Sequence, residues 1–260
     1  MLTGKSAIVT GSTSGIGLGI AESLAAQGVN VLFNGFGDAG MIDALIKEEA
    51  RKFGVKIEYS NADMSKPEQV RAMVAQAEKS FGGVDILVNN AGIQHTATIE
   101  EFPEDKWDAI IAINLSSAFH ATKAALTGMK ARGWGRIINI ASAHGLVASA
   151  TKSADVAAQH GLIGFTKVTA LEMAGNGITA NAICPGWVLT PLVQKQIDDR
   201  AAKEGISGEQ AKTELLGLKE PTMQFSTPEQ LGALAVFLCS PAGDNMTGTS
   251  LSHDGGWTAQ

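Results

Sequence analysis

Short apolar runs alternate with longer segments of helical periodicity along almost the whole chain. The apolar runs show little polar alternation, which is typical of strands buried on both faces of a parallel sheet. The segments predicted as strands are 6–10, 30–34, 56–59, 86–89, 136–140, 179–184 and 250–252. The segments predicted as helices are 15–27, 41–53, 67–81, 104–132, a stretch around 151–174, and 228–238.

Buried strands separated by helices predict an α/β fold, in which helices cover both faces of a parallel sheet. Right-handed crossovers then give a doubly wound, Rossmann-type order of about seven strands. We expect residues 1–260 to form a single domain. Residues 187–225 interrupt the alternation with a helix-rich insertion that carries Pro191 and Pro221. Because ligands of open α/β sheets bind beyond the carboxyl ends of the strands, we expect this insertion to be a substrate lid.

Composition and charge narrow the class of partner. The formal net charge is -6 and the 20 Lys and Arg residues are scattered, so nothing favours nucleic acid or an anionic membrane surface. No apolar run approaches the ~20 residues that cross a bilayer, and the first residues do not resemble a signal peptide. Cys184 and Cys239 lie in apolar surroundings typical of reduced, buried thiols. We expect a soluble cytoplasmic protein.

A glycine-rich turn joins the first predicted strand to the first predicted helix, and it reads Thr10-Gly11-Ser12-Thr13-Ser14-Gly15-Ile16-Gly17. Glycines allow a tight turn and a close approach of a pyrophosphate to the backbone. The helix N-terminus offers unpaired N–H groups and a partial positive charge to the anion. A glycine-rich turn alone is weak evidence, but its place between a strand and a helix indicates a dinucleotide site.

Further signals stand at the ends of the second, third and fourth predicted strands. Asp63 is suited either to an adenine amine or to capping the next helix, and the sequence does not separate the two. The small and amide residues of Asn89-Asn90-Ala91-Gly92 suit packing against a flat cofactor. The stretch Asn34-Gly35-Phe36-Gly37-Asp38 lacks the Arg or Lys that a 2′-phosphate requires, which favours NAD over NADP.

The glycine-rich turn, Asn89-Asn90-Ala91-Gly92 and Pro185-Gly186 together resemble the short-chain dehydrogenase/reductase family over nearly the whole chain. Within that family, residues 92–96, 142–149, 187 and 255–259 resemble the bacterial D-3-hydroxybutyrate dehydrogenases. The resemblance implies an NAD-dependent oxidoreductase with a small-molecule substrate, commonly a homotetramer, and it places Phe36 near the ribose. The expected cofactor-binding residues are Gly11, Thr13, Gly15, Ile16, Gly17, Phe36, Asp63, Asn90, Gly92, Pro185 and Gly186.

The chemistry of this family uses an Asn, a Ser, a Tyr and a Lys four positions after the Tyr. The Tyr exchanges a proton with the substrate oxygen, while the Lys lowers the tyrosine's pKa and holds the ribose. Asn114 and Ser142 match the pattern, but Asp155 stands at the place of the Tyr and Gln159 at that of the Lys. The chain has one tyrosine, Tyr59, and it belongs to the third predicted strand.

The loss of a positioned general acid removes roughly 10²–10⁴ in rate. We therefore expect strongly impaired hydride transfer, and weaker NAD binding because Gln159 replaces the ribose-holding Lys. Two replacements in otherwise intact family sequence favour an engineered variant over a natural relative. His253 is a third departure, since the family usually has an apolar residue there. It is either a tolerated core-edge residue or part of a redesigned pocket.

Asp155 is then the candidate general base. A carboxylate removed from water is a stronger base, and aromatic walls hold a planar substrate by stacking. This combination favours proton abstraction from carbon, with Asn114, Ser142 and His144 as the other candidate catalytic residues. By resemblance, the substrate-binding residues are Gln94, His144, Lys152, Trp187, Gln196 and Trp257.

Other interpretations of these residues stay open. Ser142, His144 and Asp155 are the residue types of a hydrolase triad, although Ser142 and His144 stand only two positions apart. A metal site of His144, Asp155 and His253 lacks a recognised ligand spacing, so we expect no metal. Two alternatives concern the whole protein: a catalytically dead NAD-binding pseudoenzyme, or an NAD-dependent D-3-hydroxybutyrate dehydrogenase with an unorthodox acid. The remaining histidines, expected to be structural, are His95, His120 and His160.

Overall fold

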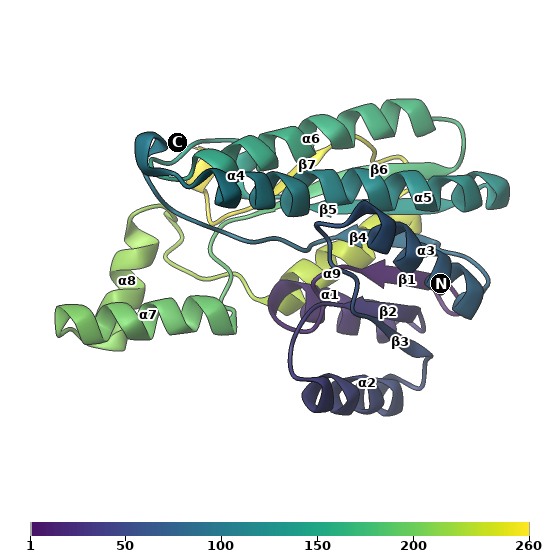
Figure 1. Ribbon diagram of the computed structural model, residues 1–260, viewed down its shortest axis with the longest axis horizontal. Helices are drawn as coiled ribbons and strands as arrows, with labels where there is room; N and C mark the ends of the chain where they lie inside the picture. Colours follow the sequence, from purple (N-terminus) through teal and green to yellow (C-terminus); the bar gives the residue numbers. More distant parts are fainter. Residues whose placement is uncertain (1, 260) are drawn as a thin grey trace.

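The computed structural model describes residues 2–259 and arranges seven strands in one sheet of order β3-β2-β1-β4-β5-β6-β7 (Figure 1). Each neighbouring pair of strands is parallel. The strands are β1 (Ser6–Val9), β2 (Asn30–Asn34), β3 (Ile57–Ser60), β4 (Ile86–Asn89), β5 (Gly135–Ile140), β6 (Ile178–Pro185) and β7 (Ser250–His253). The predicted fold class is confirmed, and the strand ends differ from the predicted ends by one residue at most.

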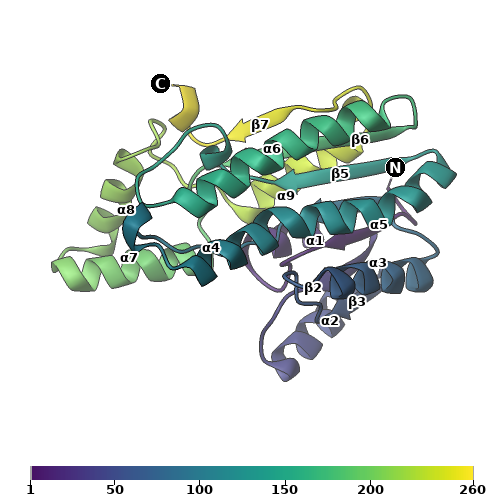
Figure 2. The ribbon, with the colours of Figure 1, turned by 45° about the horizontal axis from the view of Figure 1, so that its top comes forward.

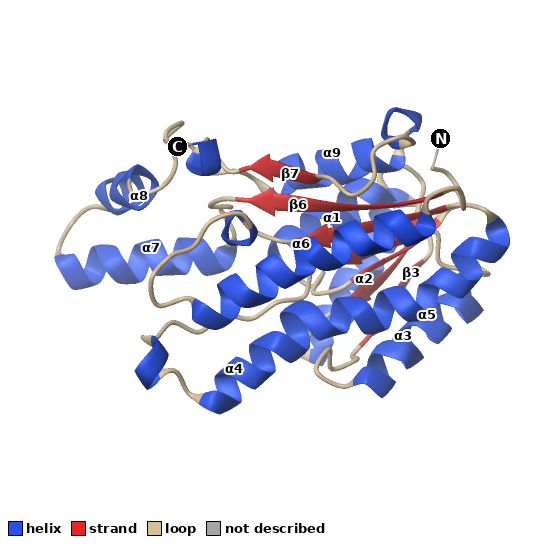
Figure 3. Ribbon diagram, turned by 90° about the horizontal axis from the view of Figure 1, so that it is seen from above, coloured by secondary structure: helices blue, strands red, loops and turns tan. Residues whose placement is uncertain are grey.

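Helices cover both faces of the sheet (Figure 3). The helices α3 (Pro67–Phe81), α4 (Glu104–Ile111), α5 (Ser117–Arg132) and α6 (Ser153–Met173) lie on one face. The helices α1 (Gly15–Ala25), α2 (Ala39–Phe53) and α9 (Pro228–Cys239) lie on the other. α1 and α9 pack against each other, because Gly19 and Gly232 leave room for a close approach of the two helices.

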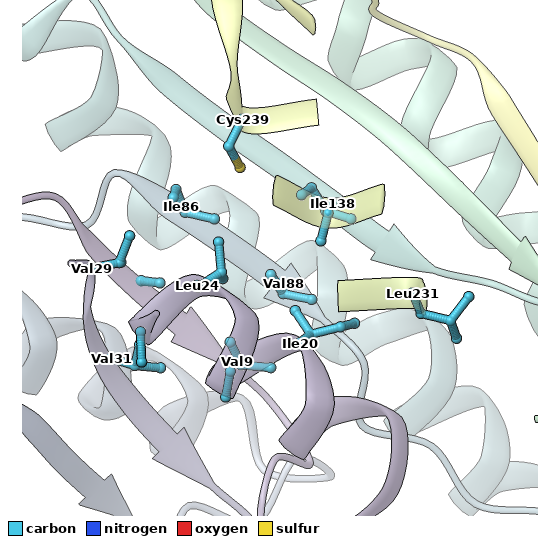
Figure 4. Packing of buried hydrophobic residues seen from close by; sticks show 14 of the residues in the cluster. Val9, Ile20, Leu24, Val29, Val31, Ile86, Val88, Ile138, Leu231 and Cys239 are labelled. Atoms are coloured by element: carbon cyan, nitrogen blue, oxygen red, sulfur yellow. The ribbon is translucent and has the colours of Figure 1, made fainter. Parts of the chain in front are cut away.

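The strands in the middle of the sheet form the core together with these helices. Branched aliphatic side chains of β1, β2 and β4 meet Ile20 and Leu24 of α1 and Leu231 of α9 (Figure 4). Burial of each such side chain contributes about 1.5–3 kcal/mol, which makes this layer a rigid support for the turns at its edge. Cys184 and Cys239 are buried free thiols, as predicted, and burial raises their pKa values to about 11 and about 12. The predicted cytoplasmic location stays a prediction.

The segment predicted as one helix over 104–132 is α4 and α5 joined by a π-helical turn at Ala112–Ser116. An 18-residue stretch of this continuous segment, Glu104–Arg132, reaches a mean hydropathy of 1.2. By length and composition alone the segment could span a bilayer, which the sequence reasoning overlooked. It packs along β4, β5 and α3 as a core helix of the sheet does. The π turn carries Asn114, and π turns inside α-helices are frequent at functional sites.

The insertion after β6 forms α7 (Pro191–Glu204) and α8 (Gly208–Gly217), which project beyond the carboxyl ends of the strands (Figure 2). The arrowheads of β6 and β7 point toward these two helices in Figure 3. Val188 and Ser226 pair in an isolated parallel bridge, so the two ends of the insertion lie side by side. The position is the one expected for a substrate lid, and that role stays a prediction.

Candidate active site

The turn between β1 and α1 has the backbone shape of an anion cradle. Gly11 and Gly15 adopt φ values of 63° and 57°, in the left-handed region that favours glycine. A Cβ atom at Gly17 would overlap the carbonyl oxygen of Gly11. The N-cap residue Ser14 makes no side-chain cap, so the first N–H groups of α1 are free for a ligand. The residues of this turn therefore fit a pyrophosphate group.

Two asparagines lock the turn from the neighbouring strands. Asn34, at the end of β2, accepts a hydrogen bond from Gly11 N (3.3 Å) and donates to the carbonyl oxygens of Ser60 (3.1 Å) and Ala62 (3.0 Å). Asn90 donates to the carbonyl oxygens of Thr10 and Gly11 at 2.8 and 3.1 Å. The Asn34 bonds join the end of β2 to the chain at the ends of β1 and β3, so the shape of the turn is fixed before any cofactor arrives.

The ends of β2 and β3 form the far side of this region. Phe36 is 68% exposed and, with Gly37, Ile42, Tyr59 and Asn61, lines a hollow beyond β2. Tyr59 lies in β3, as predicted, and its hydroxyl donates to Gly35 O at 2.7 Å. Four strand spacings of about 4.8 Å separate β3 from β5, so Tyr59 lies roughly 19 Å along the sheet from the strand that precedes Ser142.

Asp63 does not cap α3, because the N-cap residue of that helix is Lys66. Its carboxylate accepts a hydrogen bond from Ser65 N at 2.8 Å, and the Ser65 hydrogen bonds lower the pKa of Asp63. The capping interpretation is therefore wrong, while contact with adenine stays a prediction. The remaining expected cofactor residues lie at the same edge: Thr13 in the glycine-rich turn, Ile16 in the first turn of α1, Gly92 after β4, Pro185 at the end of β6 and Gly186 just after it.

Asn114 and Ser142 are both engaged with the backbone. The Asn114 side chain accepts from Ile93 N at 2.9 Å and donates to Ile93 O at 3.0 Å, which ties the π turn to the loop after β4. Ser142 begins the short 3-10 helix Ala143–Gly145, and its hydroxyl accepts from His144 N at 3.1 Å. Ser142 thus contacts the backbone of His144 rather than its ring.

Asp155 and His144 face each other inside the molecule. Asp155 is 2% exposed and His144 5% exposed, and His144 Nδ1 lies 3.3 Å from Asp155 Oδ2. The contact does not have the geometry of a hydrogen bond, and Asp155 Oδ2 has no hydrogen-bond partner. The other ring nitrogen, Nε2, lies 3.0 Å from the hydroxyl oxygen of Ser149. The imidazole is therefore held between a buried carboxylate and a serine.

Gln159 lies one helical turn after Asp155 on α6, and both side chains point into the protein. The side-chain oxygen of Gln159 is buried without a hydrogen-bond partner. A buried polar atom without a partner costs about 1–3 kcal/mol. Two buried oxygens without hydrogen-bond partners, those of Asp155 and Gln159, therefore lie one turn apart on the same face of α6.

Several of the predicted substrate residues surround this pair. Trp257 meets the His144 ring edge-to-face, with centroids 5.0 Å apart. Lys152 Nζ lies 3.5 Å from Gln94 Oε1. The pKa of Lys152 is lowered, because the effect of burial exceeds the opposing effect of the nearby Asp155 charge. Lys219, which the sequence reasoning missed, places its ammonium 5.0 Å from the Trp257 ring centroid. The region thus combines one buried carboxylate with two cations.

Trp187 and Gln196 are less firmly placed in the site. The Trp187 backbone N–H donates to Glu220, and its indole N–H is buried without a partner. Gln196 is exposed on α7, and within residues 2–259 no hydrogen bond joins it to the other predicted substrate residues. Glu220 was also missed by the sequence reasoning. Its pKa is raised to about 7, mainly because the carboxyl is buried, and the Asp254 charge adds to the rise. The hydrogen bond from the Trp187 N–H acts in the opposite direction. No sequence signal marked Glu220 or Lys219.

His253 ends β7, and its Nδ1 lies 2.8 Å from the Ser226 hydroxyl, at the base of the insertion. Within residues 2–259, no three His, Cys, Asp or Glu side chains gather in a way that would hold a metal ion. The other three histidines make local contacts: His95 with Phe102, His120 with Phe119, and His160 with the Val156 carbonyl. Of all the histidines, only His144 contacts Asp155 in the described chain.

The fold and this turn define a nicotinamide-dependent reductase scaffold. A family model described as enoyl-(acyl carrier protein) reductase matches residues 11–258, and the chain belongs to this short-chain dehydrogenase/reductase family. It is 64% identical over 260 residues to a D-beta-hydroxybutyrate dehydrogenase of Cupriavidus necator, with 100% of each chain covered. A D-beta-hydroxybutyrate dehydrogenase of Rhizobium meliloti is 53% identical over 98% of this chain and 99% of that protein.

Among solved structures, L-sorbose reductase of Gluconobacter frateurii, complexed with NADPH and L-sorbose, superposes with a TM-score of 0.95. It is 32% identical and covers 99% of this chain, which in turn covers 98% of it. An actinorhodin polyketide ketoreductase with NADPH superposes with a TM-score of 0.91 at 34% identity, and each chain is fully covered. The chain is thus an oxidoreductase scaffold that fits a nicotinamide cofactor and small-molecule substrates.

Proposed function

We propose that this chain binds NAD on a D-3-hydroxybutyrate dehydrogenase scaffold but transfers hydride very poorly, and that Asp155 serves as a general base. The observation that carries the proposal is the placement of Asp155, buried on α6 beside His144 where the family pattern expects a tyrosine. A carboxylate, unlike a phenol, carries no proton that it could give to an alkoxide. Its buried oxygen is free to accept a proton instead.

The cofactor half of the proposal rests on the first turn of the fold. The glycine-rich turn and the N-terminus of α1 would hold the pyrophosphate, and no Arg or Lys follows β2 to pair with a 2′-phosphate. Asp38 caps α2 by accepting from Met41 N at 3.0 Å. NAD would supply the hydride acceptor when bound. We expect its affinity to be lowered, because Gln159 offers no positive charge to hold the ribose.

The substrate half rests on the walls around Asp155. Trp257 and His144 present ring edges and faces, while Lys152 and Gln94 offer donors to an anionic group. Such walls suit a small planar carbon acid, such as a 3-oxo acid, whose proton Asp155 would remove. Both replacements fall on one face of α6, in a chain that is 64% identical over its full length to a natural dehydrogenase, and we interpret Asp155 and Gln159 as engineered changes.

Two measurements test this proposal. The first is NADH formation from D-3-hydroxybutyrate, together with NAD binding by calorimetry. NAD binding with turnover close to background supports impaired hydride transfer, whereas rates ordinary for such dehydrogenases would overturn it and favour a dehydrogenase with an unorthodox acid.

The second measurement addresses the base. Exchange of the C2 protons of acetoacetate with deuterated water, followed by NMR, should be faster with this chain than with buffer. Asp155→Asn should lose most of that excess, since an amide cannot accept the proton. NAD binding without any catalysed exchange would instead favour the catalytically dead NAD-binding protein.

A homotetramer is the assembly that the family resemblance implies. The outer faces of α5 and α6 expose Phe119 (45%), Val168 (53%) and Leu171 (79%), and the Phe119 and Phe165 rings meet with centroids 6.2 Å apart. Apolar side chains gathered on neighbouring helices support self-association through this face. Light scattering on the purified chain would measure the mass directly.

A further inference from the structure

We propose that Ser149, His144 and Asp155 act in series as a nucleophile, a general base and an orienting carboxylate that hydrolyse small activated esters. The serine hydroxyl lies 3.0 Å from His144 Nε2, and His144 Nδ1 lies 3.3 Å from Asp155 Oδ2. A nucleophile within hydrogen-bond reach of a base, which a third group orients in turn, is the arrangement of acyl-transfer catalysis. This inference goes beyond the proposed function, with which it shares Asp155 and the neighbouring His144.

The exposure of the three side chains increases from the carboxylate to the base and then to the nucleophile. Asp155 and His144 are 2% and 5% exposed, whereas Ser149 is half-buried in the loop that follows the Ala143–Gly145 turn. A buried carboxylate favours the tautomer with the proton on Nδ1, which leaves Nε2 to accept the serine proton. The long contact to Asp155 suits a resting state, because catalytic hydrogen bonds often tighten only in the substrate complex.

Ser149 rather than Ser142 is the serine of this series. The Ser142 hydroxyl accepts from the backbone N–H of His144 and has no contact with its ring nitrogens. The edge of Trp257 holds the imidazole from a third side, with ring centroids 5.0 Å apart. The imidazole is therefore in contact with Ser149, Asp155 and Trp257 at once.

The reaction needs no oxidant and no cofactor. Ser149 Oγ bonds to the ester carbonyl carbon and gives its proton to His144 Nε2. The bond to the leaving oxygen then breaks, and that oxygen either takes the proton back from His144 or leaves as an anion while His144 releases the proton to solvent. Water then bonds to the acyl carbon and passes a proton to His144, and the acyl–Oγ bond breaks as Oγ regains its proton. The products are a carboxylic acid and an alcohol.

The test uses the full chain without NAD and p-nitrophenyl acetate as the probe, because its good leaving group lowers the demand for oxyanion stabilisation. We expect catalysed release of p-nitrophenolate, and a trapped acetyl group on Ser149 in peptide mass spectra. General-base activation contributes about 10²–10⁴-fold, so Ser149→Ala and His144→Gln should each slow release by at least about tenfold. Ser240→Ala, which changes a serine at the end of α9, should leave the rate unchanged.

Three outcomes would overturn the proposal: equal rates for Ser149→Ala and the parent chain, acetylation of a lysine or of His144 in place of Ser149, or no release above buffer. A phosphonofluoridate probe adds a readout that does not depend on turnover, since it should label Ser149 in the parent chain and not in His144→Gln. Ser149→Ala should keep acetoacetate exchange while it loses ester hydrolysis. Asp155→Asn should lose both activities, so the failure of this inference and the failure of the proposed base can be told apart.

Discussion

The turn after β1 and the buried face of α6 differ in whether their polar side-chain atoms have hydrogen-bond partners. At the turn, both ends of the Asn34 amide are paired, and Asn90 donates twice to the same backbone. On α6, Asp155 Oδ2 and Gln159 Oε1 are buried without hydrogen bonds. A fully paired network is rigid and specifies one shape, whereas an unpaired buried oxygen stores a penalty. The contrast teaches that the amides that hold the glycine-rich turn are paired, whereas two oxygens on the α6 face are not.

The largest effect should come from restoring the family residues on α6. Asp155→Tyr with Gln159→Lys supplies the proton donor and the ribose-holding cation together, so oxidation of D-3-hydroxybutyrate should rise by about 10²–10⁴-fold or more, measured as NADH formation. Each single change should recover much less, because residues that act as a unit are not additive. A double variant that folds and binds NAD but does not oxidise this substrate would show that the substrate assignment is wrong.

The second effect concerns Glu220, which lies under Trp187. Because its pKa is raised to about 7, the folded chain keeps a proton on Glu220 that the unfolded chain loses near the ordinary value of 4.5. Its stabilising contribution is therefore complete below pH 4.5 and is lost as the pH rises to about 7. The loss is about 3 kcal/mol in the free energy of unfolding.

Denaturant unfolding at pH values on both sides of this window measures the effect. Glu220→Gln keeps a neutral side chain and should remove most of the decline with rising pH. Glu229→Gln is the matched control, because hydrogen bonds lower the pKa of the exposed Glu229, so this change should leave the decline in place. An unchanged slope in Glu220→Gln would place the titration elsewhere.

A smaller effect tests the cofactor platform. Gly17→Ala forces a Cβ atom against the Gly11 carbonyl and the Asn90 amide, so the turn must shift at a cost of about 1–3 kcal/mol. The dissociation constant for NAD, measured by calorimetry, should rise about tenfold or more. Gly164→Ala is the control, since a Cβ atom there meets nothing within 4 Å. An unaltered affinity in Gly17→Ala would mean that the turn is softer than its hydrogen bonds indicate.

The smallest effect separates paired from unpaired amides. Gln159→Met removes a buried oxygen without a partner, and we expect the free energy of unfolding to rise by about 1 kcal/mol. Gln76→Met removes a hydrogen bond of 3.0 Å to Tyr59 O and should lower it by about the same amount. Equal effects of the two changes in thermal unfolding would remove the contrast between the two regions.

Much of this structure could be predicted because it repeats a periodic pattern. Strands of unbroken apolar residues and the strand–turn–helix glycines fix the sheet and the pyrophosphate turn from local sequence alone. The π turn at Ala112–Ser116 was not predictable, since its residues continue the helical pattern on both sides. The contact of Ser149 with His144 depends on how a loop folds back, and Glu220 reaches Trp187 across 33 residues. Such contacts depend on tertiary packing and therefore cannot be predicted from the spacing of residues along the sequence.

The parallel bridge between Val188 and Ser226 holds the two ends of the α7–α8 insertion at one strand spacing from each other. With both ends held, the entropy of closing the loop grows only with the logarithm of its length, and doubling that length costs only about 0.6 kcal/mol. The stability of the sheet should therefore depend little on the length of the segment between Val188 and Ser226. Longer, shorter or unrelated segments could replace α7 and α8 between these two residues. Substrate specificity can thus evolve or be redesigned while the cofactor-binding turn stays unchanged.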